Sequence, residues 1–308
     1  MSCDTYGYYF SLASAGTDFY MAWYATTGWE SFIYGHGIAG TGGLGPFFTH
    51  ATGQDYGQCR STVYGPVRAV PVRQSVYHVQ WYAGDGCWGT PWFERIDSAA
   101  AWLDGAEQDS RTWYPPPLDS GFDGADEDAF AAWFYSQTSI AGRWAIGGQN
   151  VAVSTRTPSS VGSAPSVAAA NGSVVVVWSQ EHTVAGVDTQ IRATRVTRDL
   201  GRLEPDGGML VANVPSGITS SPVATFDGSR WLAAWTELAA ATQTNDLRVV
   251  SIGTDGTLGS PVVIAEDVAA GSMRIASTRD GRALVAFARR HDDLYGIRSM
   301  LVDPSIVP

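Results

Sequence analysis

The side chains best suited to chemistry in this sequence are aromatic rings and carboxylates, and they are concentrated in the first half of the chain. Nine of the 12 Trp and 12 of the 13 Tyr lie within residues 1–155. Flat rings beside acids suit a sugar, because the C–H face of a pyranose stacks on indole while carboxylates accept hydroxyl hydrogen bonds. The same set suits a quaternary ammonium group through cation–π attraction. Alternatively, these residues bind no small ligand, and the rings pack irregular loops or form a contact with another protein.

Acidic residues of this half could also form the carboxylate pair of a glycosidase. Such an enzyme needs two carboxyl groups about 5–5.5 Å or 6.5–9.5 Å apart across the bond that breaks. Glu30, Asp85 and Asp119 are the first candidates, since they lie among the aromatic residues or at the start of an expected strand. Each could equally be a solvated loop acid.

The five His residues are dispersed and show no spacing typical of a metal site. His182 and His291 occupy matching positions with Arg289 nearby, where a lyase-type base and a cation for a substrate carboxylate could be built; solvated loop residues are the alternative. The acidic run 123–128 could hold Ca²⁺ but aligns with a turn, and the glycine-rich run 40–45 lacks the Lys of a phosphate loop. We therefore expect no metal and no cofactor.

Composition narrows the class of protein. Charged residues make up 16% of 308, with a net charge of −11, which argues against nucleic acid because phosphates need clustered cations. No apolar stretch approaches the roughly 18 residues of a membrane helix. The 35 Gly and 15 Pro favour many turns over long helices.

The elements that must position these residues come from an internal repeat. Each copy reads as a turn, a short apolar run and a Trp, as in Asn171-Gly172 before Trp178 and Asp227-Gly228 before Trp235. The anchor aromatics are separated by 58, 52, 45, 57 and 52 residues, and they are Trp23, Trp81, Trp133, Trp178, Trp235 and Phe287.

Each repeat is expected to form four antiparallel strands. In the fifth copy, the runs 221–226, 231–235, 247–252 and 261–265 are separated by two Asp-Gly turns and one loop, and Asp-Gly between β-branched runs predicts a hairpin. Four-stranded units repeating about every 50 residues are typical of β-propeller blades. We therefore predict an all-β, six-bladed β-propeller as a single domain over 1–308. Its expected blades are approximately 7–55, 56–116, 117–160, 161–218, 219–270 and 271–308 plus 1–6.

The pattern Pro-x-Val-Ala-x-x-(Asp/Asn)-Gly, a Val- or Ala-rich strand ending in Trp, and a further strand ending in Asp-Gly resembles the β-propeller repeats of secreted proteins from myxobacteria and related bacteria. The resemblance is clear over 160–308, fair over 119–150 and 8–50, and poor over 51–118. It implies a propeller and export, and it carries no catalytic residues. The last repeat stops after its third strand, so its outer strand should come from 305–307 or from 1–6. The second option closes the ring by an N-to-C clasp and removes a free sheet edge.

The repeat places the surplus aromatics on one face of the ring. Loops between second and third strands and connections between blades emerge there, and over blades 1–3 they are rich in Gly and Trp. We expect an aromatic-lined ligand face formed by Trp29, Glu30, Tyr56, Asp85, Trp88, Trp113 and Tyr114.

The three Cys leave room for one disulfide. Cys59 and Cys87 fall in adjacent loops of the second repeat on the expected ligand face, so we predict that they form a bridge. Two buried free thiols are the alternative, and Cys3 is left unpaired in either case.

The leading hypothesis for function is noncatalytic, lectin-like recognition of a carbohydrate or similar neutral ligand by an acidic bacterial repeat protein. The alternatives are a polysaccharide-acting hydrolase or lyase and a protein–protein scaffold. Residues 1–4 lead into Tyr-rich sequence without the apolar core of a signal peptide. We expect a secreted or cell-surface protein whose leader has been removed, and a cytosolic protein is the alternative.

Overall fold

The structure is a computed structural model, and it describes most but not all of the chain. The described residues are 10–15, 18–26, 30–39, 43–54, 62–73, 76–84, 90–97, 101–106, 121–125, 128–136, 139–144, 150–155, 165–170, 172–182, 188–199, 201–214, 221–239, 244–269, 273–277, 281–291, 294–302 and 307. Two compact units divide the chain: unit 1 is Met1–Ala129 with Trp144–Gly148, and unit 2 is Phe130–Arg143 with Gln149–Pro308.

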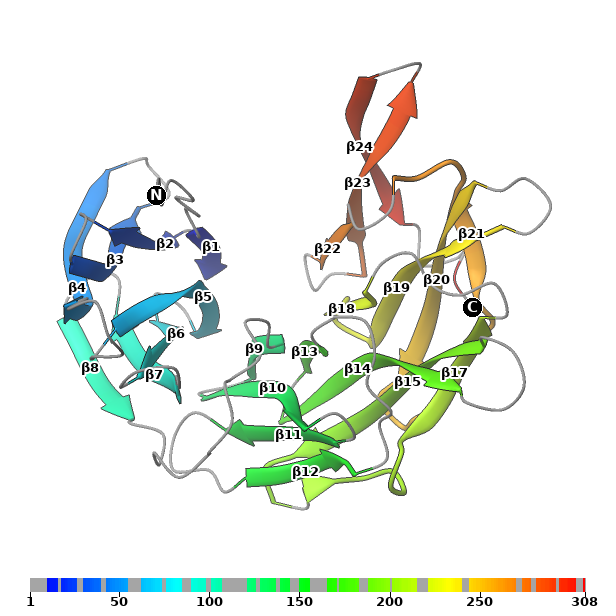
Figure 1. The fold of residues 1–308 in the computed structure, drawn as a ribbon, viewed down its shortest axis with the longest axis horizontal. Coiled ribbons are helices and arrows are strands. Elements are labelled where there is room, and N and C mark those ends of the chain that lie inside the picture. Colours follow the sequence, from blue (N-terminus) through cyan, green and yellow to red (C-terminus); the bar gives the residue numbers. More distant parts are fainter. Residues whose placement is uncertain are drawn as a thin grey trace, which may run out of the picture. The chain divides into compact units, whose positions relative to one another are not determined.

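The described residues form antiparallel sheets and no helix (Figure 1). The first sheet consists of β1 (Phe10–Ala15), β2 (Asp18–Thr26), β3 (Glu30–Ile38) and β4 (Leu44–Gln54). The second consists of β5 (Thr62–Arg73), β6 (Val76–Gly84), β7 (Thr90–Asp97) and β8 (Ala101–Ala106). The third consists of β9 (Gly121–Ala125), β10 (Asp128–Ser136), β11 (Ser139–Trp144) and β12 (Asn150–Ser154).

Three more sheets follow in unit 2. The fourth contains β13 (Ser166–Ala170), β14 (Ser173–His182), β15 (Asp188–Thr197), the short β16 (Gly201–Arg202) and β17 (Met209–Val214). The fifth contains β18 (Val223–Phe226), β19 (Arg230–Leu238), β20 (Asn245–Gly253) and β21 (Val262–Ala265). The sixth contains β22 (Arg274–Ser277), β23 (Ala283–His291) and β24 (Leu294–Val302).

The prediction of an all-β protein built from four-stranded antiparallel blades is confirmed. All six anchor aromatics lie on the second strand of a sheet, from Trp23 on β2 to Phe287 on β23. The sixth sheet ends with β24 at Val302, and Val307 is fully buried in the core that this sheet shares with the fifth. The two segments expected to supply its outer strand, 1–6 and 305–306, lie outside the described residues. The count of six blades in one closed domain and the strand clasp stay predictions.

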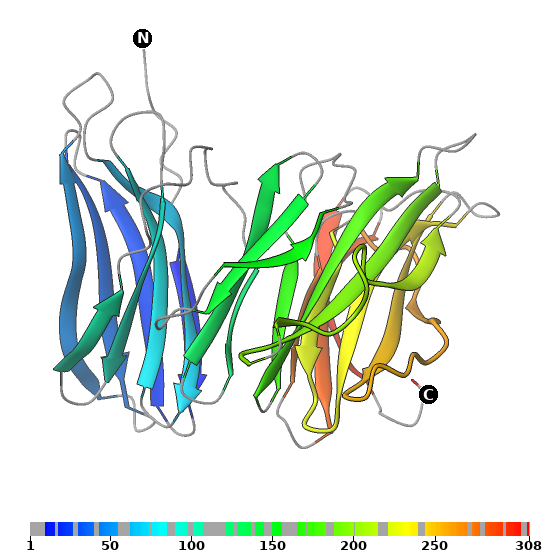
Figure 2. The same ribbon diagram turned by 90° about the horizontal axis from the view of Figure 1, so that it is seen from below.

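Sheets pack face to face in unit 2, where Figure 2 shows their strands side by side. Trp231 and Trp235 of β19 are fully buried against small aliphatic residues of the fourth sheet, such as Val175 and Ala193. Alternate residues of the same strand, including Leu232, point the other way into a core with the sixth sheet. The fifth sheet therefore buries both faces, which is why its strands read as nearly continuous apolar runs.

The Asp-Gly pairs form the predicted hairpin turns. Gly228 follows β18 with φ 105°, a left-handed conformation that favours glycine. The carboxylate of Asp227 is buried and accepts hydrogen bonds from the backbone N–H groups of Ser229 and Arg230 at 2.9 and 3.0 Å. Burial raises the pKa of Asp227, but these bonds outweigh it and the net shift is downward. The backbone carbonyl of Asp227 accepts from the N–H of Gly281 at 2.7 Å, two residues before β23 of the sixth sheet, so the turn also links the fifth and sixth sheets.

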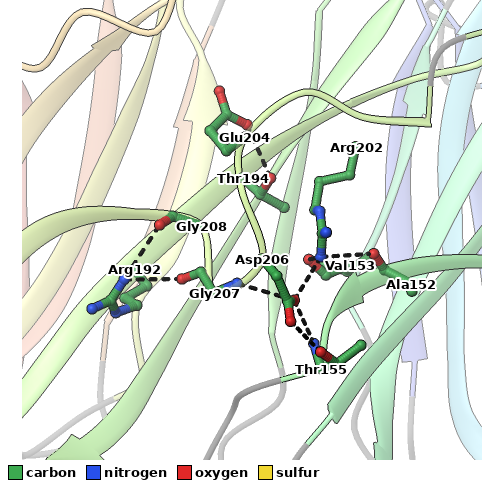
Figure 3. A network of polar contacts seen from close by, with 10 residues as sticks. All are labelled: Ala152, Val153, Thr155, Arg192, Thr194, Arg202, Glu204, Asp206, Gly207 and Gly208. Atoms are coloured by element: carbon green, nitrogen blue, oxygen red, sulfur yellow. Dashed lines mark hydrogen bonds and ion pairs between the residues drawn. The ribbon is translucent and has the colours of Figure 1, made fainter.

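A polar network joins the third and fourth sheets (Figure 3). Asp206, in the segment between β16 and β17, accepts from the backbone N–H of Thr155 at 2.9 Å and from its hydroxyl, and it pairs with Arg202 at 2.7 Å. Arg202 also donates to the backbone carbonyls of Ala152 and Val153 at 3.4 Å. The Thr155 hydroxyl, followed by its backbone N–H and Arg202, lowers the pKa of Asp206 to about 2.

A search of the described residues for a helix that is long and apolar enough to cross a membrane finds none.

Replacing the buried turn carboxylate should destabilise unit 2. Asp227→Ala leaves the N–H groups of Ser229 and Arg230 without their acceptor, and we expect a loss of about 3 kcal/mol in the free energy of unfolding. Urea unfolding followed by Trp fluorescence measures this loss. Asp255→Ala, at the exposed Asp-Gly turn after β20, is the matched control and should cost clearly less; equal costs would contradict the role given to Asp227.

The network around Asp206 predicts a pH dependence. The folded-state pKa lies below the unfolded value, so its stabilisation is complete above about pH 4 and is lost as pH falls through about 2. Asp206→Asn should lower stability by about 1 kcal/mol at neutral pH, because this carboxylate is partly exposed, and should flatten the decline between pH 4 and 2. Melting temperature against pH tests this, with Asp199→Asn at an exposed turn as the control. A parallel decline in the Asp206 variant would refute the prediction.

Candidate functional site

Glu30 is the one predicted ligand residue that lies within the described part of the chain. It is the first residue of β3 and is exposed. The other predicted contacts, Trp29, Tyr56, Asp85, Trp88, Trp113 and Tyr114, lie outside the described residues, as do Asp119 and the predicted disulfide between Cys59 and Cys87.

The described strands show which sheet edges border the segments that hold these residues. In an antiparallel sheet the end of the second strand, the start of the third and the end of the fourth lie at the same end of the strands. We call this end the loop-bordering edge of the sheet. In the first sheet this edge carries Thr26, Glu30 and Gln54, which border 27–29 and 55–61. In the second sheet the same edge borders 85–89 and, after β8, 107–120. The short connection 55–61 joins the two edges, consistent with the predicted grouping of these loops within unit 1.

Aromatic rings cover one face of the first sheet. Trp23 lies opposite Tyr34 with ring centres 5.8 Å apart, and Phe47 lies 5.9 Å from Trp23 and 5.2 Å from Tyr34. Phe32 stacks on Tyr34 at 5.2 Å with an interplanar angle of 8°. These rings are partly exposed, Phe47 to 55%, and the strand that carries Phe32 and Tyr34 begins at Glu30. The face therefore presents a cluster of partly exposed aromatic rings that ends at a carboxylate.

The opposite face of the first sheet is a packed core. The Tyr20 hydroxyl lies 2.7 Å from Nε2 of His50, and Tyr20 stacks on Tyr77 of β6 with ring centres 5.3 Å apart. Gly35 leaves the space for this pair, because a Cβ there would lie 2.0 Å from the Tyr20 hydroxyl. His50 thus contributes to packing between the first two sheets.

Other sequence candidates keep their places in the repeat. His182 ends β14 and His291 ends β23, so both occupy the end of a second strand, as expected from the repeat. The acidic run 123–128 was expected at a turn, but Asp123 lies within β9, where its carboxylate accepts a hydrogen bond from the N–H of Gly124 at 2.8 Å. Within the described residues, no group of three or more His, Cys, Asp or Glu side chains could hold a metal ion.

A polar row that sequence reasoning missed crosses the fourth sheet. Nε2 of Gln180 donates to Oε1 of Gln190 at 3.1 Å, and Nε2 of Gln190 donates to Oδ1 of Asn213 at 3.1 Å. Arg192, opposite the anchor Trp178, donates to the same Oε1 of Gln190 from Nε and Nη2 at 3.1 and 3.0 Å. Its Nη1 donates to the backbone carbonyl of Gly207 at 3.1 Å, and burial lowers the pKa of Arg192.

The fifth sheet repeats this row with acidic residues. Trp235 lies opposite Arg248, and Glu237 lies opposite Asp246. The carboxylate of Glu237 accepts from Nε1 of Trp235 at 3.0 Å and pairs with Nε of Arg248 at 2.5 Å. Arg248 also lies 4.0 Å from Asp246. Both rows can be recognised in the sequence. In each, one polar residue follows the anchor Trp by two positions, and a second polar residue precedes the facing Arg by two positions.

No protein-family model matches this chain, and no curated protein matches its sequence. Among solved structures, the chain is similar to the Hadza microbial sialidase Hz136, with a TM-score of 0.52 and 11% identity over 98% of this chain and 66% of that one. The chain thus spans slightly less than two thirds of that sialidase.

It is also similar to a point mutant of the lectin from Aleuria aurantia, solved in complex with Fucα1-6GlcNAc. The TM-score is 0.50 and the identity 12%, over 97% of this chain and 96% of the lectin. The complex of that mutant with α-methyl-L-fucoside gives a TM-score of 0.50 at 13% identity. At such identities the likeness shows the fold alone, and that fold is a β-propeller.

The carboxylate of Glu237 should contribute to stability through its two donors. Glu237→Gln removes the negative charge beside Arg248 and weakens the bond from Trp235, so we expect a loss of about 1–2 kcal/mol in the free energy of unfolding. Chemical denaturation measures it. Glu266→Gln, which removes an exposed carboxylate in the same unit, should change little, and an equal loss in both variants would show that general charge accounts for the effect.

Proposed function

We propose that this protein is an exported recognition module that binds a carbohydrate or similar neutral ligand on an aromatic-lined face over its first three blades. The ligand contacts are Trp29, Tyr56, Trp88, Trp113 and Tyr114, with Glu30 and Asp85 as hydrogen-bond acceptors. The proposal includes six blades in one ring and a bridge between Cys59 and Cys87 that holds two of the loops together.

The observation that carries the proposal is the position of Glu30. It stands exposed at the loop-bordering edge of the first sheet, immediately after Trp29 in the chain and at the end of the aromatic face of Phe32 and Tyr34. A carboxylate beside flat rings supplies the two contacts that a sugar needs, since the rings cover its C–H face and the acid accepts from its hydroxyl groups.

The similar structures support the ligand class. The Aleuria aurantia lectin binds fucose-containing ligands in its complexes, and the other similar protein is a sialidase. Both names indicate proteins that bind or act on sugars, so a carbohydrate ligand is consistent with the fold. The sialidase also favours the second candidate, an enzyme that acts on a polysaccharide, and the test separates the two.

The test is a glycan panel read by Trp fluorescence, with reducing-end and unsaturated-product assays on the same mixtures. A recognition module should give saturable quenching without product. Trp29→Ala and Trp88→Ala should each weaken binding by tenfold or more, which corresponds to about 1.4 kcal/mol per contact, and Glu30→Gln should weaken it several-fold.

Ile297→Ala is the matched control, because it removes an exposed apolar side chain from β24 in unit 2, outside the aromatic face and the loop-bordering edge of the first sheet. It should leave glycan binding unchanged. Product release that is lost in Glu30→Gln would establish the enzyme instead, and capture of a protein partner with no glycan binding would establish a scaffold.

A further inference from the structure

The fourth and fifth sheets carry the same arrangement of an anchor Trp, a residue two positions later and a facing Arg, but they differ in charge. In the fifth sheet the middle residue is Glu237, and its carboxylate accepts a hydrogen bond from Trp235 and forms an ion pair with Arg248. In the fourth sheet the equivalent residue is the neutral Gln180. One repeat therefore contains its own anion between two donors, and the other does not.

The two donors of the fourth sheet have no carboxylate between them among the described residues. The Trp178 side chain is 0% exposed, and its Nε1 has no hydrogen-bond partner among the described residues. Within the same part of the chain, no carboxylate forms an ion pair with Arg192, whose bonds go to neutral oxygens of Gln190, Gly207 and Gly208. A buried donor without an acceptor is costly, because it does not recover its lost hydration. Arg192 is half-buried, and the neutral oxygens that accept from it leave its charge without a counter-ion.

An unpaired acceptor lies beside these donors. Oε1 of Gln180 is buried and has no hydrogen-bond partner among the described residues. The row then continues outward through Gln190, which is 6% exposed, to Asn213, which is exposed on β17. The set therefore offers an N–H donor, a guanidinium and an amide oxygen, and it reaches the surface at one end.

We propose that this row in the fourth sheet binds the carboxylate of a small hydroxylated acid, with Trp178 and Arg192 as donors to the carboxylate and Gln180 as acceptor from the hydroxyl group. The fifth sheet shows the bound arrangement within the protein itself, since Glu237 supplies there the carboxylate that the ligand supplies in the fourth. This site lies in unit 2 and goes beyond the neutral ligand proposed for blades 1–3.

The experiment uses glycolate as the probe and glycolamide, its neutral isostere, as the comparison, both followed by isothermal titration calorimetry on the full chain at constant ionic strength. We expect one glycolate per chain with a Kd in the millimolar range or tighter, and at least tenfold weaker binding of glycolamide. Millimolar affinity is well within what a ligand of this size can reach.

Gln180→Glu is the decisive variant, because it places in the fourth sheet the internal carboxylate that the fifth already has. It should raise the melting temperature and weaken glycolate binding at least tenfold. Arg192→Gln should also abolish binding, and if it unfolds the chain, Gln180→Glu still decides the question. Asn150→Asp, which adds the same charge at an exposed position of β12, should change neither quantity.

The proposal is overturned if glycolate gives no binding, if glycolamide binds equally well, or if Gln180→Glu binds as tightly as the unmodified protein. Trp29→Ala should leave glycolate binding intact. Loss of the glycan site and loss of the carboxylate site are therefore separate results, and failure of one does not decide the other.

Discussion

The contact on which the rest of this structure depends is the packing of large aromatic side chains from one sheet against small aliphatic side chains of the sheet before it. Trp231 and Trp235 lie on β19 and are buried against alanines and valines of the fourth sheet, while Leu232 faces the sixth. A sheet that is apolar on both faces needs a neighbour on each side, because no helix covers it within the described residues. This requirement restricts the choice of residues on both faces and leaves more chemical variation to the strand ends.

The same packing explains why the fold could be predicted from the sequence. The repeat is visible because each blade needs an anchor aromatic on its second strand and a tight turn before it, as at Asp227-Gly228 before Trp235. The third strand of that repeat was expected at 247–252 and lies at Asn245–Gly253. The split outer region of the fourth sheet, with β16 and β17, was not expected. It depends on contacts such as Thr155 with Asp206, which lie 51 residues apart and leave no local pattern.

The candidate site was less predictable for a related reason. Residues such as Trp29 and Trp88 are expected between strands, where no periodicity ties a side chain to a direction, so the sequence predicts their sheet edge but not their geometry. The polar rows did leave a signal. Gln180 and Glu237 lie two residues after their anchors, so they occupy the same face as Trp178 and Trp235. The repeat itself is defined by apolar residues and turns, to which these polar positions do not contribute.

The difference between Gln180 and Glu237 separates a stabilising position from a functional one. In the fifth sheet, Glu237 and Asp246 surround Arg248, so the cation is neutralised and Trp235 has its acceptor. If stability alone determined this position, the same acid would serve the fourth sheet, where Arg192 is likewise drawn out of solvent. An amide there leaves Arg192 with neutral acceptors only and the indole N–H of Trp178 without an acceptor, which lowers the stability of the unoccupied protein. Local rules are broken in this way where a site must accept something from outside, because an internal carboxylate would already fill it.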